Sequence, residues 1–456
     1  MKKKLVVAAA AGAMCVAATT AFALENEFHG MYKAMGYSSN FFNGYTLAPA
    51  QTSTLLRKDA GVSNFFEQRA RLMYIAKAND NLKLVTHFEL DSRFGGVAGG
   101  YKGITTGNDS GNLDADQLTL ETKNVYLDTN CPITGANIKI GIQPWADSYQ
   151  SLFLLADMTG LYVTKKFDPL TASFGWFRYA DLDTNTNWAG DASNDLFVVD
   201  AKYAINKDMT VGASLYAIDN GTNTLPSNVK DMYMPGVNAS LTFGPATINP
   251  FVAVQFGRTT GNQNLNGFLG GATAKVKNVG PGNINAAFVY MSGDDRATSS
   301  TSYGKAFKPV SANTSYFNAA NMWLLVRSGQ AVNSSTSVTG NDLTVGGRGL
   351  VGIFAGYEGT RDKAFYNANV GYAMTAEQRK NGTTEESSSL GTELNATVGY
   401  KLYDNLAVSL TGAYAILGDA LKKSAASNGK GISGFATTVA DADNPWLANL
   451  QLSYTF

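Results

Sequence analysis

The final stretch of the chain, from Trp446 to Phe456, restricts the fold more than any other segment. Every second residue from Trp446 to Phe456 is apolar or aromatic, and the residues between them are polar and uncharged after Leu447. This period of two predicts a β-strand whose two faces meet different surroundings. Its length matches the roughly 9–11 residues that a tilted strand needs to cross a bilayer. Aromatic residues at both ends of the apolar face are typical of a membrane-spanning strand.

The first 23 residues predict a secretory signal peptide. Lys2, Lys3 and Lys4 precede an apolar run too short to span a membrane, and Ala21-Phe22-Ala23 fits the small-x-small cleavage rule. Cleavage before Leu24 leaves a single cysteine, so residues 24–456 have no internal disulfide. Cleavage also removes three lysines from a chain of zero net charge, which leaves a slightly acidic protein. That balance argues against nucleic-acid binding.

The rest of the composition is compatible with a membrane β-barrel. No run of 18 apolar residues follows the signal peptide, which excludes transmembrane helices. The mean hydropathy of −0.11 does not exclude a barrel, because alternating strands average out in such a measure. The 47 glycines, 24 phenylalanines and 22 tyrosines fit a curved β protein with aromatic rings at the membrane surfaces.

Short turns and long loops alternate between the expected strands of residues 24–456. Short turn sequences occur at 79–81, 168–169, 206–208, 244–245, 361–363 and 403–405. The long connections include 94–116, 144–160 and 292–347. This alternation predicts an all-β fold: a transmembrane antiparallel up-and-down β-barrel of about 18 strands, or alternatively 16, with long external loops and short periplasmic turns. A water-soluble sheet would show the same alternation in a single strand, but the long meander favours the barrel.

One hairpin and the chain terminus carry a family resemblance. The hairpin contains Arg69 and Arg71 and turns at Asn79-Asp80-Asn81, and the chain ends in Tyr454-Thr455-Phe456. These features resemble outer-membrane porins, in particular the porin-like channel proteins of anaerobic deltaproteobacteria. The resemblance implies a water-filled channel in the bacterial outer membrane, often a homotrimer, whose third external loop narrows the lumen. By our count this loop is 144–160. It also implies contacts with outer-membrane lipid, lipopolysaccharide and the barrel assembly machinery.

The period of two also predicts which charged side chains face the lumen. A charge on the lipid face would cost roughly 2–4 kcal/mol at the membrane midplane, so charged residues belong inside. The predicted pore-lining residues are Glu67, Arg69, Arg71, His87, Glu89, Asp91, Arg93, Lys139, Lys202 and Lys401. Asp200, Lys275 and Glu393 share this inward parity.

The inserted loop suggests how ions are selected. Asp147 and Asp157, both within 144–160, would face Arg69 and Arg71 across a narrow ring, and ions would cross the field between them. Alternatively, the two arginines pair with Glu67 and Glu89 only to satisfy one another in the lumen wall.

No motif of catalysis or cofactor binding stands out. Residues 347–352 match G-x-G-x-x-G, but they open a strand after a polar loop instead of leading into a helix. His29 and His87 are the two histidines, and no H-E-x-x-H or G-x-S-x-G motif occurs. We therefore predict a porin for passive diffusion of small hydrophilic solutes and ions, without cofactor, metal or enzyme activity. A barrel that sheathes an electron-transfer cytochrome and a barrel enzyme are the alternatives.

Overall fold

The computed structural model describes most of the predicted exported chain. The described residues are 24–42, 56–95, 120–181, 193–221, 229–296, 304–330, 336–381, 383–423, 430–432 and 441–456. The predicted signal peptide, 1–23, lies outside them.

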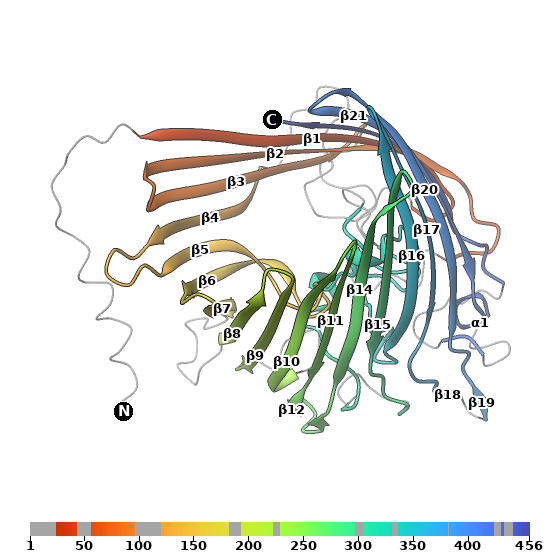
Figure 1. Cartoon of the computed structure of the whole chain (residues 1–456). Helices are drawn as coiled ribbons and strands as arrows, with labels where there is room; N and C mark the ends of the chain where they lie inside the picture. Colours follow the sequence, from red (N-terminus) through yellow and green to blue (C-terminus); the bar gives the residue numbers. More distant parts are fainter. Residues whose placement is uncertain are drawn as a thin grey trace.

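Antiparallel strands form the wall of the molecule (Figure 1). They are β1 (Glu25–Ser39), β2 (Ser63–Asn79), β3 (Leu82–Arg93), β4 (Glu121–Asn130), β5 (Asn137–Ala146), β6 (Leu155–Lys166), β7 (Leu170–Asp181), β8 (Ser193–Asn206), β9 (Met209–Asn220), β10 (Val229–Phe243), β11 (Ala246–Val254), β12 (Phe256–Thr259), β13 (Asn264–Leu265), β14 (Phe268–Val279), β15 (Gly282–Met291), β16 (Leu350–Arg361), β17 (Ala364–Met374), β20 (Ser389–Tyr403), β21 (Leu406–Leu417) and β22 (Trp446–Thr455). A separate hairpin consists of β18 (Lys380–Asn381) and β19 (Thr384–Glu385), and the short helices are η4 (Ala312–Thr314), η5 (Asn318–Ala320) and α1 (Asp419–Lys422).

The wall is a closed barrel of 18 strands, as the sequence predicted. Each strand pairs with the next one along the chain, and β1 also pairs with β22 from Ser39↔Leu447 to Met31↔Thr455. The wall contains 20 strand segments because two of the 18 barrel strands are interrupted. β11 and β12 both pair with β10, and β13 and β14 continue the next strand.

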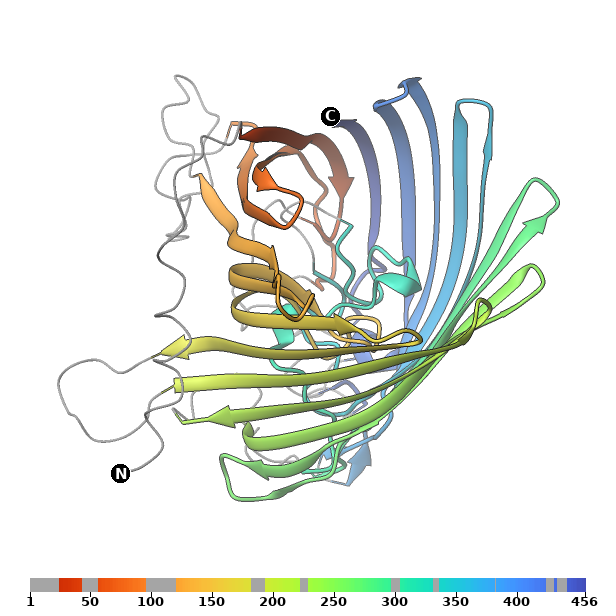
Figure 2. The ribbon, with the colours of Figure 1, turned by 60° about the vertical axis from the view of Figure 1, so that its left-hand side comes forward.

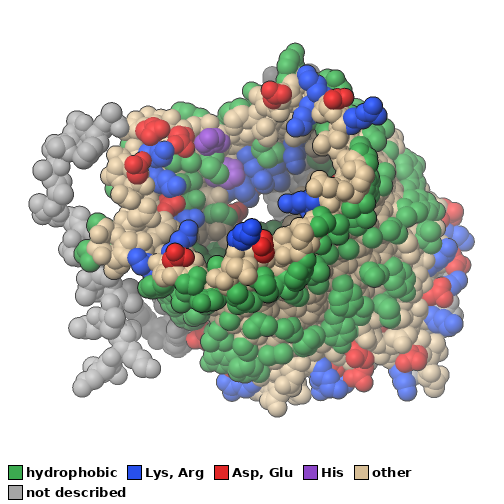
Figure 3. Space-filling view, viewed as in Figure 1, with side chains coloured by type: hydrophobic (Ala, Val, Ile, Leu, Met, Phe, Trp, Pro, Cys, Tyr) green, Lys and Arg blue, Asp and Glu red, His purple; other side chains and the backbone are tan. Residues whose placement is uncertain are grey.

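The outer surface of the barrel is apolar. Leu72, Val398, Leu410 and Leu450 are each about half exposed, and all of them lie on the outward face of their strands. Figure 3 shows hydrophobic side chains covering the outer face of the wall that is in view. A continuous apolar belt of this kind is the surface that a barrel presents to lipid. Within the described residues, none of the helices has the length and apolar character needed to span a membrane.

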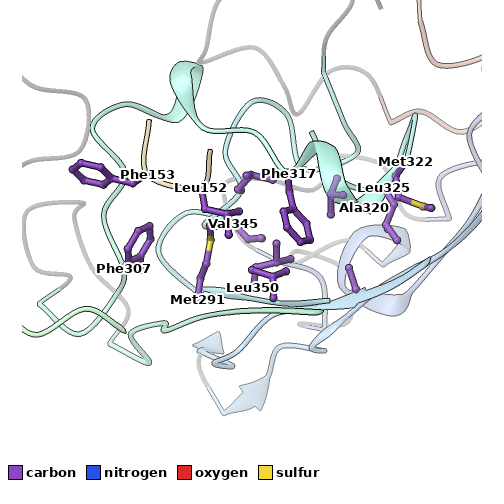
Figure 4. Packing of buried hydrophobic residues seen from close by; sticks show 14 of the residues in the cluster. Leu152, Phe153, Met291, Phe307, Phe317, Ala320, Met322, Leu325, Val345 and Leu350 are labelled. Atoms are coloured by element: carbon purple, nitrogen blue, oxygen red, sulfur yellow. The ribbon is translucent and has the colours of Figure 1, made fainter. Parts of the chain in front are cut away.

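Two loops fold into the barrel, where they form an apolar core of their own. The connection between β5 and β6 is 147–154, shorter than the predicted loop of 144–160, because both strands extend further than expected. The connection between β15 and β16 was predicted as a long external loop, and the sequence did not show whether it folds into the barrel. Its described residues run inside the wall (Figures 1 and 2). Figure 4 shows Phe317 and Met322 of this loop above Met291 and Leu350 at the ends of the wall strands. Backbone hydrogen bonds join the two loops to each other, including Tyr316 N–H to the Ser151 carbonyl at 2.9 Å.

Candidate functional site

Charged side chains of β2 and β3 form one wall of the candidate site. The strand register places Arg69 opposite Asp91 and Arg71 opposite Glu89. Arg69 Nε donates to Asp91 Oδ1 at 2.6 Å, and the same nitrogen lies 3.2 Å from Glu89 Oε2. Arg71 also donates to Glu89. The two arginines are therefore held by carboxylates of the neighbouring strand, which fixes their position on the wall.

A second charged pair lies where β4 and β5 separate. These strands pair only as far as Val125↔Ile142, and beyond this point the hairpin of β5 and β6 leaves the regular wall. Lys123 Nζ lies 2.9 Å from Asp157 Oδ2, and Asn124 Nδ2 donates to Asp157 Oδ1 at 2.7 Å. Side chains thus link β4 to β6 where the backbone ladder stops.

Asp157 lies in strand β6 and not in a loop, which corrects the sequence expectation. In the register, Asp157 is opposite Pro144, on the face of the hairpin that points away from Trp145 and Met158. Trp145 packs on Phe177, with ring centroids 5.7 Å apart. Because the end of the hairpin is packed against the inner side of the wall, the face that carries Asp157 is turned toward the remaining lumen.

The long loop supplies the uncharged side of the site. Arg327 lies over the ring of Tyr316, 4.0 Å from its centroid, and donates from Nη2 to the Tyr316 hydroxyl at 2.8 Å. The side-chain amide of Gln330 donates to Asn321 Oδ1 and to the Met322 carbonyl, both at 3.1 Å. These contacts hold the aromatic ring and the amide of the loop in fixed positions.

Together these elements enclose a cavity of about 510 Å³. The side chains that line it are Met31, Lys33, Arg69, Arg71, Glu89, Lys123, Pro144, Leu155, Ala156, Asp157, Asn313, Thr314, Tyr316 and Gln330, together with Gly329. Figure 3 shows a hollow inside the barrel in which Lys and Arg side chains gather.

The charges around the cavity form two layers. The side chains of Arg69, Arg71 and Lys123 are 18–28% exposed, whereas those of Glu89 and Asp91 are only 5–6% exposed. The carboxylates therefore lie beneath the cationic groups, and a solute in the cavity meets the cations first. Asp157, at 30% exposure, is the acidic group that reaches this surface among the described lining residues.

Asp147 does not face Arg69 and Arg71, contrary to the constriction hypothesis. Its carboxylate is buried and accepts backbone N–H bonds from Tyr149, Ser151, Phe153 and Leu154 at 2.6–3.1 Å. Burial raises the pKa of Asp147 to about 6, while these donors act to lower it. The side chain serves as the internal acceptor of its own loop, because the loop has no strand partner for these N–H groups.

The remaining predicted pore residues are spread over the wall. Glu67 is buried opposite Arg93, Arg93 lies over the Phe65 ring, and His87 Nδ1 lies 3.2 Å from Asn124 Oδ1, beside the cavity. Three lysines lie away from the cavity lining: Lys139, over the Tyr126 ring, and the exposed Lys202 and Lys401.

Sequence reasoning did not place Lys33 or the loop groups at the site. Lys33 has the inward parity of Met31 and Met35, so the period of two in β1 could have identified it. Tyr316 and Gln330 lie in irregular backbone, where no periodicity shows which way a side chain points. In the described part of the chain, no group of three or more His, Cys, Asp or Glu side chains is arranged to hold a metal ion.

The fold is similar to that of several solved outer-membrane proteins. The outer membrane protein opdK from Pseudomonas aeruginosa matches with a TM-score of 0.53 and 11% identity over 95% of this chain and 98% of that one. OccK8 (OprE) from the same species has the same TM-score, identity and coverage of both chains. A BenF-like porin from Pseudomonas fluorescens Pf-5 has a TM-score of 0.51 and 13% identity over 95% of this chain and 98% of that one. No protein-family model matches the chain, and neither does any curated protein. At this level of identity the likeness establishes the barrel fold.

Proposed function

We propose that this protein is a porin of the bacterial outer membrane, a passive diffusion channel for small hydrophilic solutes and ions. The observation that carries the proposal is the charged cavity inside a barrel whose outer surface is apolar. A polar passage through an apolar shell is the arrangement that lets hydrated solutes cross a bilayer. The fold shared with the opdK protein and the BenF-like porin supports the same conclusion.

The layered charges support a preference for anions. Arg69, Arg71, Lys33 and Lys123 line the cavity, and among the described lining residues Glu89 and Asp157 oppose them. Because Glu89 is buried beneath the arginines, the cationic groups are the charges closest to a solute in the cavity. Anions are therefore expected to enter more readily than cations.

Electrical recording from the purified protein tests this proposal. In planar bilayers the protein should form open channels, and a salt gradient should give a reversal potential of the sign expected for anion preference. Liposomes that contain the protein should swell in small sugars. A folded protein that neither conducts nor permits swelling would exclude the porin function.

The cytochrome sheath is less well supported. A partner threaded through the barrel would have to displace the loop cores around Phe153 and Phe317, which are fully buried against the wall. The homotrimer, the contacts with lipopolysaccharide and the assembly machinery, and the closer relation to deltaproteobacterial porins remain proposals that rest on the sequence resemblance. We propose no catalytic step for the lumen.

A further inference from the structure

A buried carboxylate of the barrel wall holds the long loop in place. Glu393 lies in β20, a strand that β21, β22 and β1 separate from the charged strand β2. Its side chain is fully buried. Oε1 accepts the N–H of Trp323 at 2.8 Å, and Oε2 accepts those of Leu324 and Leu325 at 2.9 and 2.7 Å. Asn395 also donates to Oε1 at 2.9 Å.

These bonds fulfil a need of the loop backbone. Trp323, Leu324 and Leu325 lie inside the barrel in irregular structure, so their N–H groups have no strand partner. A buried N–H group without an acceptor costs roughly 1–3 kcal/mol. Three successive N–H groups that converge on one carboxylate satisfy both the backbone and the buried charge. Glu393 thus takes the place of a strand partner for this part of the loop.

The anchored backbone is tied to the side chains that line the cavity. The Met322 carbonyl, next to the anchored residues, accepts hydrogen bonds from the Ser328 hydroxyl at 2.5 Å and from the Gln330 amide at 3.1 Å. Arg327, two residues beyond Leu325, bonds to the Tyr316 hydroxyl. Tyr316 and Gln330 both line the cavity. A shift of the anchored residues would therefore move the uncharged side of the passage.

We propose that Glu393 is a positioning residue that sets the width of the passage by anchoring residues 323–325 to the wall, an inference that rests on the porin function proposed above. It acts through the loop, since it does not line the cavity itself. With the anchor in place, the distance between Tyr316 and the cationic groups of β2 has one value. Without the anchor, the loop samples several positions, and the passage alternates between wider and narrower states.

Single-channel recording of Glu393→Ala and Glu393→Gln tests the role of the anchor. Wild-type protein should show one main conductance level. Glu393→Ala should show several levels that span at least two-fold in conductance, and Glu393→Gln should fall between, since one amide oxygen can keep part of the bonding. Glu358→Ala is the control: Glu358 is a wall carboxylate bonded to Lys275 at 2.6 Å, and it lies away from this cavity. It should retain the single level.

Amide hydrogen exchange supplies a readout independent of conduction. In Glu393→Ala the amides of 323–325 should exchange at least ten-fold faster than in wild type, with the strands of the barrel equally protected. If the wild-type protein does not conduct, the porin function is excluded. If Glu393→Ala nevertheless shows the faster exchange, the anchoring of residues 323–325 by Glu393 still holds. Wild-type conductance levels in both Glu393 variants would overturn the inference. If Glu393→Ala does not fold, the isosteric Glu393→Gln decides by the same two measurements.

Discussion

At the scale of single residues, Asp157 is the charge that opposes the cationic surface of the cavity. It neutralises Lys123 at 2.9 Å and is more exposed than Glu89. Replacing Asp157 with Asn removes one negative charge within a few ångströms of passing ions, and at physiological salt this should raise the anion-to-cation permeability ratio about two-fold. Reversal potentials in a salt gradient measure this ratio.

The matched control for this charge change is Asp208→Asn, because Asp208 is exposed in a short turn away from the cavity. It should leave the permeability ratio unchanged. A ratio that is the same in Asp157→Asn and wild type would show that ions do not pass this cavity.

The buried amine of Lys308, in the long loop, should make the free energy of unfolding depend on pH. Burial lowers the pKa of Lys308 to about 8, from an ordinary value of 10.5. Between these values the folded chain carries the neutral amine while the unfolded chain still binds the proton, so stability should rise with pH across this window. From pH 8 to 10 the contribution amounts to about 2 kcal/mol.

Urea unfolding of wild type and Lys308→Met at pH 8 and pH 10 isolates this effect, because the other titrating groups are common to both proteins. The free energy of unfolding of wild type, taken relative to the variant, should increase by about that amount. An equal pH dependence in the two proteins would contradict a buried amine with a lowered pKa.

At the scale of elements, the loop between β5 and β6 depends on one acceptor. Asp147 binds four backbone N–H groups of 147–154, and Asn offers one acceptor oxygen and turns an NH₂ group toward these donors. Asp147→Asn should therefore weaken the loop by roughly 1–3 kcal/mol. The amides of 149–154 should then exchange at least ten-fold faster, without loss of protection in β7–β10. Equal rates in the variant, in wild type and in Asp208→Asn would refute this role.

The elements also show how much the sequence could predict. Strands and turns follow from local chemistry: the period of two placed Arg69, Arg71 and Glu89 on the inner face. The alternation of short turns and long loops predicted about 18 strands, with 16 as the alternative, and 18 is correct. Asp157 was expected on an inserted loop facing Arg69 and Arg71; it lines the cavity with them, but from strand β6, because the hairpin of β5 and β6 continues beyond the regular wall. Parity placed Glu393 on the inner face, but its role and that of Asp147 could not be predicted from sequence, since both depend on backbone N–H groups in irregular loops.

At the scale of the whole molecule, the interior combines two kinds of packing. The sequence resemblance implied a water-filled lumen narrowed by one inserted loop, and the region near β1–β4 has that polar character. The region near β15–β17 is instead covered by the apolar side chains of the long loop, such as Phe317 on Phe354 with ring centroids 5.7 Å apart. Aromatic packing of this kind depends on contacts between a loop and distant strands, which no local sequence pattern encodes. The loop therefore leaves the charged cavity beside β2 and β3 unfilled.

The pairing of β1 with β22 imposes an order on the folding of the barrel. Neighbouring strands elsewhere follow one another along the chain, whereas the bond from the Ser39 hydroxyl to the Trp446 carbonyl joins residues 407 positions apart. Hairpins can form within microseconds, but this contact has to wait until the last strand has arrived. Throughout that wait, β1 exposes a row of unpaired backbone groups that any other strand could join. The β1–β22 pairing is thus the part of an incomplete barrel that is most exposed to mispairing. An assembly factor that protects the edge of β1 would be needed until β22 has paired with it.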